Sequence, residues 1–178
     1  PVQEDDMIDL NELEAAMTKE TILVSIMYGN NEIGVIQPLK EIAAIAHKYG
    51  ALFMTDATQA VGKIPVDVNA DGIDLLAFSA HKIYGPKGVG ALYVRRKGPR
   101  VKVTAQMDGG GHERGMRSGT LNVPGIVGFG KACELCMQEM ESEAKRLSAM
   151  RDRLQKSLLV LEESYVNGNV EHRLPHVA

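Results

Sequence analysis

The sequence predicts an α/β fold: a mainly parallel sheet with helices on both faces. Apolar runs at 21–27, 51–55 and 73–78, the first of them rich in β-branched residues, alternate with segments of helical spacing. This order produces a parallel sheet, because each parallel strand needs a crossover connection to reach the next. The runs are also almost continuously apolar, which is typical of strands that are covered on both faces.

The segments between the runs carry their own boundary signals. Asn11 is predicted to cap a short helix over 12–17. Pro38 opens a second helix, in which apolar residues keep helical spacing until Gly50 ends it. Residues 91–95 follow the third run after a short loop, so we expect them to form an antiparallel strand.

The last third of the chain is predicted to form a long amphipathic helix, from about 123 to 161, with a break near 128–130. Glu141 and Lys145 are spaced to form a favourable ion pair on a solvated helix face. The final stretch, 174–178, is strand-like.

Composition narrows the class of protein. With 44% hydrophobic and 24% charged residues, the 178-residue chain is expected to be a soluble globular protein. The net charge of −3 without a long basic run argues against nucleic acid as the main partner. No apolar stretch is long enough to span a bilayer and the start is not a signal peptide, so we expect no membrane association. Two cysteines and nine methionines suit a reducing cytosol better than a disulfide scaffold, so we expect a cytoplasmic location.

The two cysteines, Cys133 and Cys136, fall inside the predicted long helix. A zinc site needs a second pair of ligands at suitable spacing, and none is visible. We therefore expect ordinary packing of both thiols and no metal site.

The most informative stretch surrounds Lys82, which follows the third apolar run and precedes a turn signal at 85–88. Ser79 and His81 lie beside this lysine, at the end of a strand, where open α/β sheets bind ligands. A lysine amine becomes a nucleophile for carbonyl compounds when desolvation or nearby cations lower its pKa. The residues alone are equally consistent with a surface lysine beside a tight turn.

Three more polar residues follow neighbouring strands. Asp56 ends the second apolar run, and Gln59 lies three residues further on, in a predicted helical turn at 57–61. Asn31 lies in a polar loop after the first run. The ordinary interpretations are a helix cap, a surface amide and a turn residue. The functional one is a set of ligand-binding groups.

A glycine-rich loop at 104–120 is either a flexible connection or a set of backbone amides and arginines arranged for an anion.

Four of these segments together resemble one known family. The stretches 79–88, 30–34, 55–60 and 109–120 are similar to motifs of the cysteine desulfurases of iron–sulfur cluster assembly, within the class V aminotransferase group. The similarity runs over about residues 8–178. It implies the large domain of a fold type I transferase that uses pyridoxal 5'-phosphate (PLP).

The resemblance implies a cofactor-binding set made of Asn31, Asp56, Gln59, Ser79, His81, Lys82 and Thr120. Lys82 is implied to be the catalytic residue and to hold PLP as a Schiff base. Asp56 is implied to pair with the pyridinium nitrogen, and Gln59 and Asn31 to bind the ring substituents.

The phosphate of PLP is implied to bind Ser79 and His81, and Thr120 is implied to reach the phosphate of the partner subunit in a homodimer. Ala80, Lys87 and the 117–120 stretch are similar to the housekeeping type of desulfurase.

The implied reaction takes sulfur from L-cysteine, giving L-alanine and an enzyme persulfide for a sulfur-acceptor or scaffold protein. A selenocysteine lyase, another class V aminotransferase and a non-catalytic module remain as alternatives.

Family members are about twice as long as this chain. They supply a ring-stacking histidine, a substrate-carboxylate arginine and a mobile-loop cysteine from segments that are not in this sequence. We therefore expect residues 1–160 to be part of a large PLP-binding domain and 161–178 to lead into a truncated small domain. The chain alone is expected to be inactive, and neither of its cysteines takes the catalytic role.

Overall fold

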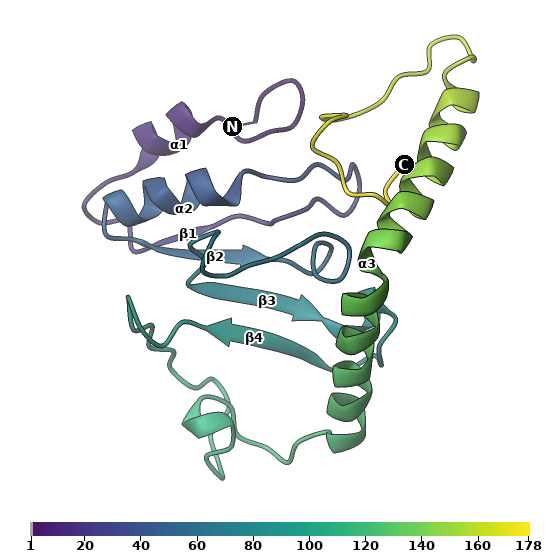
Figure 1. Cartoon of the computed structure of the whole chain (residues 1–178). Coiled ribbons are helices and arrows are strands. Elements are labelled where there is room, and N and C mark those ends of the chain that lie inside the picture. The colour runs from purple at the N-terminus through teal and green to yellow at the C-terminus, as the bar shows by residue number, and fades with distance from the viewer. Residues whose placement is uncertain (1) are drawn as a thin grey trace.

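The computed structural model describes residues 2–178 and contains a sheet of four strands (Figure 1). The strands lie in the order β1-β2-β3-β4; the first three are parallel, and β4 runs antiparallel to β3. Their bounds are Leu23–Ser25 (β1), Leu52–Asp56 (β2), Leu75–Ser79 (β3) and Gly90–Val94 (β4). The predicted α/β class and the antiparallel fourth strand are confirmed.

Three α-helices and two short 3-10 helices accompany the sheet. Figure 1 shows α1 and α2 on one side of the sheet, and α3 across the end toward which β3 points. No described helix is both long enough and apolar enough to cross a membrane. The bounds are Leu10–Ala16 (α1), Leu39–Lys48 (α2), Ala80–Ile83 (η1), Glu113–Gly115 (η2) and Val123–Leu158 (α3).

The start of α1 differs from the prediction. Asp9, and not Asn11, is the N-cap, because its carboxylate accepts from the backbone N–H of Asn11 at 2.8 Å and of Glu12 at 3.1 Å. These are two of the amides that a helix start leaves unpaired. Asn11 is consequently inside the first turn.

The predicted break in α3 is also wrong, since the helix is continuous through Gly128 and Gly130. The ring of Phe129, between them, packs against Phe78 with centroids 5.2 Å apart. A Cβ on Gly128 would lie 2.7 Å from Pro86 Cγ. The glycine there permits close approach of the helix to the turn after β3. Further along α3, the predicted pair forms, with Lys145 Nζ 2.6 Å from Glu141 Oε1.

The main core lies between α2 and one face of the sheet. Val24, Phe53 and Leu76 point from that face into a cluster with buried residues of α2. Because side chains alternate along a strand, their neighbours point the other way. On that second face Leu23 is 42% exposed and Leu92 50% exposed. The part of the chain that the structure describes therefore leaves these two leucines without the second helix layer expected from the sequence.

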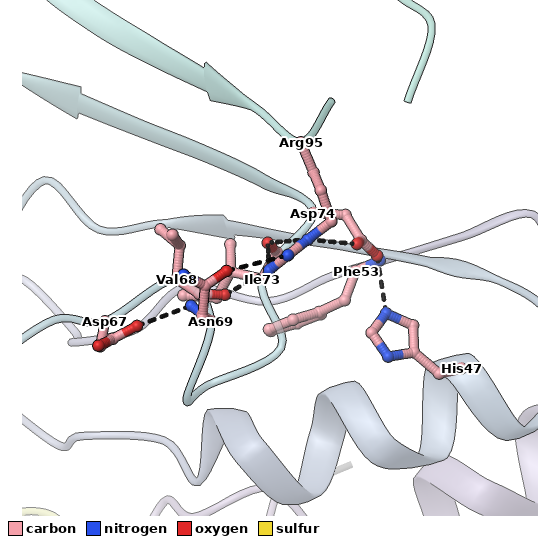
Figure 2. Close-up of polar contacts among 8 residues, drawn as sticks. All are labelled: His47, Phe53, Asp67, Val68, Asn69, Ile73, Asp74 and Arg95. Atoms are coloured by element: carbon pink, nitrogen blue, oxygen red, sulfur yellow. Dashed lines mark hydrogen bonds and ion pairs between the residues drawn. The ribbon is translucent and has the colours of Figure 1, made fainter. Parts of the chain in front are cut away.

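A buried carboxylate connects four elements at the start of β3 (Figure 2). Asp74 is fully buried, and its Oδ2 accepts from the backbone N–H of Phe53 at 2.9 Å and lies 2.8 Å from His47 Nε2. Arg95 Nε is 3.2 Å from Asp74 Oδ1, yet its hydrogen is directed at the Ile73 carbonyl. Oδ1 thus receives a nearby positive charge and no hydrogen bond.

A second, smaller core holds η1 in place. Ala80 and Ile83 of η1 pack against Phe129 and Ala132 of α3. Gly62 approaches this core so closely that a Cβ there would lie 2.8 Å from both Cys136 Sγ and Ile83 Cγ2.

The Asp74 cluster predicts a large loss of stability for Asp74→Ala. Removing the carboxylate leaves the largely buried Arg95 without its opposite charge and the buried N–H of Phe53 without an acceptor, which costs about 3–5 kcal/mol. Denaturant unfolding measures this change. Glu141→Ala, which removes one partner of an exposed ion pair, is the control and is expected to change little. Equal losses in the two variants would contradict the role of Asp74.

Gly62→Ala should destabilise the chain more than Gly50→Ala. Both glycines have a positive φ, 73° and 76°, so both substitutions carry the left-handed penalty of about 1–2 kcal/mol. Around Gly50 a Cβ meets nothing within 4 Å, whereas at Gly62 it collides with Cys136 and Ile83. Overpacking should add about 1–3 kcal/mol, measured by thermal or denaturant unfolding. Adding Cys136→Ala should recover part of that difference; no recovery would argue against the collision.

Candidate active site at the strand ends

The ends of β2 and β3 bring the main candidate residues to one edge of the sheet. The two strands are parallel neighbours, and Asp56, the last residue of β2, pairs with Ala77 of β3. Ser79 ends β3 and η1 follows at once, so His81 and Lys82 continue from the same edge. Strand register therefore brings together groups that lie more than twenty residues apart in the sequence.

The turn that carries Lys82 is anchored on both sides. Ala80 N–H donates to the Val89 carbonyl at 3.1 Å, and Gly85 N–H donates to the Ala80 carbonyl at 2.9 Å. Ala80 and Ile83 are buried, while Lys82 between them is exposed. The backbone is thus held firmly and the amine is left accessible.

Ser79 and His81 act as a pair, with Ser79 Oγ 2.6 Å from His81 Nδ1. When His81 accepts from the hydroxyl, its Nε2 carries the remaining hydrogen. A hydroxyl and an imidazole next to an ammonium group form a donor set suited to an anion such as phosphate.

Asp56 serves the ordinary role considered for it, since its Oδ1 accepts from Thr58 N–H at 2.9 Å and starts the turn at 57–61. The carboxylate is exposed, and its Oδ2 has no hydrogen-bond partner among residues 2–178. Capping the turn occupies one oxygen and leaves the other available to a ligand.

Asn31 is exposed in the loop that follows β1. The turn there is made by its neighbour, because Asn30 Oδ1 accepts from Glu32 N–H at 2.8 Å and Ile33 N–H at 3.0 Å. The Asn31 amide is therefore not needed for the local structure.

Gln59 is partly buried, and its Oε1 lies 3.5 Å from His176 Nε2. His176 was not among the residues predicted from the sequence. The two residues are 117 positions apart, and no local pattern indicates their contact.

Thr120 is separated from the other candidates in the sequence. It is exposed at the end of the glycine-rich loop, just before α3. Figure 1 shows this loop extending beyond β4, the edge strand.

The sheet edge at the ends of β2 and β3 is open to solvent. Residues 2–178 do not form the desolvated pocket around Lys82 that the sequence suggested. A cavity of about 270 Å³ lies close by, lined by Lys63, Ile83, Tyr84 and Cys136 among others, and Lys82 is not part of its wall. The chemistry of the donor set nevertheless fits PLP: a free amine, a carboxylate with one open oxygen, and a hydroxyl–imidazole pair share one edge of the sheet.

The cysteines behave as expected for packed thiols. Both are partly buried against the second core, and burial raises the pKa of each. Within residues 2–178 no group of histidine, cysteine or acidic side chains is arranged to hold a metal ion.

Comparison with known proteins places the chain in a family. The family model for aminotransferase class V matches residues 1–178. Cysteine desulfurase IscS of Anaeromyxobacter dehalogenans is 58% identical over 97% of the chain, and that of Photorhabdus laumondii is 55% identical over 98%. The chain spans 43% of the length of these curated relatives.

Solved structures give the same result. A NifS-like protein superposes with a TM-score of 0.92 at 42% identity, over 98% of this chain and 47% of its own. DndA from Streptomyces lividans superposes with a TM-score of 0.87 at 35% identity, over 97% of this chain and 49% of its own. The resemblance first seen in four short motifs thus extends over the whole fold, and the chain belongs to the class V aminotransferase family.

Proposed function

We propose that the chain is the central, cofactor-binding segment of a PLP-dependent cysteine desulfurase of the iron–sulfur cluster assembly type. The observation that carries this proposal is the cluster at the ends of β2 and β3: Lys82 with the Ser79–His81 pair, beside Asp56. The identity of 55–58% to cysteine desulfurases supports the choice of reaction within the family.

In this proposal Lys82 is the covalent attachment point of PLP, and its amine later moves a proton on the substrate. Asp56 holds a proton on the ring nitrogen through the oxygen that is not engaged by Thr58. When bound, PLP supplies an electron sink for reactions at the substrate α-carbon. Ser79 and His81 bind the phosphate, and Asn31 and Gln59 bind the ring substituents.

The overall reaction breaks the C–S bond of L-cysteine. L-cysteine and an enzyme thiol give L-alanine and an enzyme persulfide, so sulfur leaves the substrate and becomes bound to the protein. The sulfur then passes to an acceptor or scaffold protein. In this proposal neither Cys133 nor Cys136, which pack against the second core, supplies the thiol.

A homodimer is part of the proposal. Thr120 is exposed at the end of the glycine-rich loop, where it is accessible to the phosphate of a partner subunit. Residues 161–178 remain predicted as the entry to a small domain, and the cytoplasm remains the predicted location.

Lys82→Ala should abolish specific attachment of PLP. The 178-residue chain is mixed with PLP, its yellow absorbance is recorded, and the adduct is reduced with borohydride and located by peptide mass. Lys87→Ala is the matched control, because Lys87 is an exposed lysine in the same turn. We expect weak labelling at residue 82 in the unchanged chain and in the control, and none in Lys82→Ala. Labelling spread evenly over surface lysines would contradict the assignment.

In the full-length parent, Lys82→Ala should lower sulfide release from L-cysteine by at least about 10²-fold, because a positioned acid–base group contributes that much. Sulfide and L-alanine are measured together. Amino transfer to a keto acid without sulfide would favour another class V aminotransferase, and a preference for selenocysteine would favour a lyase.

A further inference from the structure

The C-terminal segment returns to the candidate site and is held there firmly. Ile36 N–H donates to the His172 carbonyl, and Leu174 N–H donates to the Gly34 carbonyl, both at 2.8 Å. Arg151 Nη1 donates to the Leu174 carbonyl at 2.9 Å, and Leu174 is fully buried. The backbone at Leu174, two residues before His176, is therefore held in one position.

This anchoring places the His176 ring against Gln59. The distance from Nε2 to Oε1, 3.5 Å, is at the long end for a hydrogen bond, and both side chains are partly buried. Gln59 is itself fixed by the turn after β2, in which Val61 N–H donates to the Ala57 carbonyl at 2.9 Å. Two constrained segments thus meet at one polar contact.

The surroundings of His176 favour its neutral form. Burial, and then the positive charges of Lys63 and Lys82, lower the pKa of this histidine. A neutral imidazole has one N–H donor and one acceptor nitrogen. Since Nε2 faces a carbonyl oxygen, Nε2 carries the hydrogen, and Nδ1 is the acceptor; Nδ1 is buried without a partner in the described chain.

This tautomer has a consequence for Gln59. An amide offers an oxygen that accepts and an NH₂ group that donates. With Oε1 engaged by His176, the NH₂ group remains as the part of Gln59 that a ligand can use. An oxygen anion on a ligand needs such a donor, and it would be repelled by Oε1 if the amide were reversed.

We propose that His176 is a positioning residue, which holds the Gln59 amide in the orientation that presents NH₂ to the phenolic oxygen of bound PLP. This inference rests on the proposed function, because it assumes that Gln59 contacts the cofactor. It adds a residue from the C-terminal segment to a site that is otherwise built from the strand ends.

The first test needs no cofactor. In ¹⁵N NMR spectra of the 178-residue chain, His176 should be the neutral Nε2–H tautomer at pH 6.5, the ordinary pKa of histidine. His176→Leu should shift the Gln59 side-chain NH₂ signals, and His176→Asn, whose amide can still donate, should largely restore them. His172→Leu, which changes an exposed histidine of the same segment, is the control.

The second test measures PLP affinity of the same variants. His176→Leu should weaken binding about 3- to 10-fold, the effect of one hydrogen bond, and His176→Asn should recover most of it. An Nδ1–H tautomer, unchanged Gln59 signals in His176→Leu, or equal weakening in the Leu and Asn variants would overturn the inference. If His176→Leu does not fold, the tautomer of His176 in the unchanged chain and the PLP affinity of His176→Asn still test the inference. Loss of specific PLP attachment in the unchanged chain would instead count against the proposed function, leaving the NMR result to stand by itself.

Discussion

The fully buried carboxylate of Asp74 is the constraint on which the arrangement of the sheet depends. It binds the backbone of β2 at Phe53, the side chain of His47 from α2 and the guanidinium of Arg95 beyond β4 (Figure 2). A shift of one residue in strand register would turn every side chain to the opposite face. By tying β2 and β4 to the start of β3, Asp74 favours the register in which Asp56 ends beside Ala77 and Lys82 follows at the same edge.

The two ends of β3 differ in the contacts that surround them. At its start, the ion pair of Asp74 with Arg95 and hydrogen bonds from these side chains to the backbone hold the strands together. At its end, η1 is held by apolar contacts with α3 and leaves its lysine exposed. Rigid backbone around an accessible amine is what a covalent cofactor site requires, because the attacking group must be oriented before it reacts.

Many elements of the fold could be predicted from local sequence patterns. The strands, the helix that ends just before Gly50, the antiparallel β4 and the packed cysteines all follow from spacing that neighbouring residues determine. Local patterns failed where the same residues were compatible with two local structures. Asp9 replaced Asn11 as a cap because either side chain can accept from helix-start amides. The glycines of α3 indicated a break, but the helix is continuous through them and packs closely against Pro86 and Phe78.

The sequence by itself determined the residue types and their local order: a lysine after a buried strand, a serine and a histidine beside it, and an aspartate at the end of another strand. Only the tertiary structure decided which of them meet, because strand pairing and chain return act over long separations. It brought Asp56 to the edge that carries Lys82, left that edge open to solvent, and placed His176 against Gln59. A contact between residues 117 positions apart leaves no local periodicity in the chain, since it depends on packing and not on spacing.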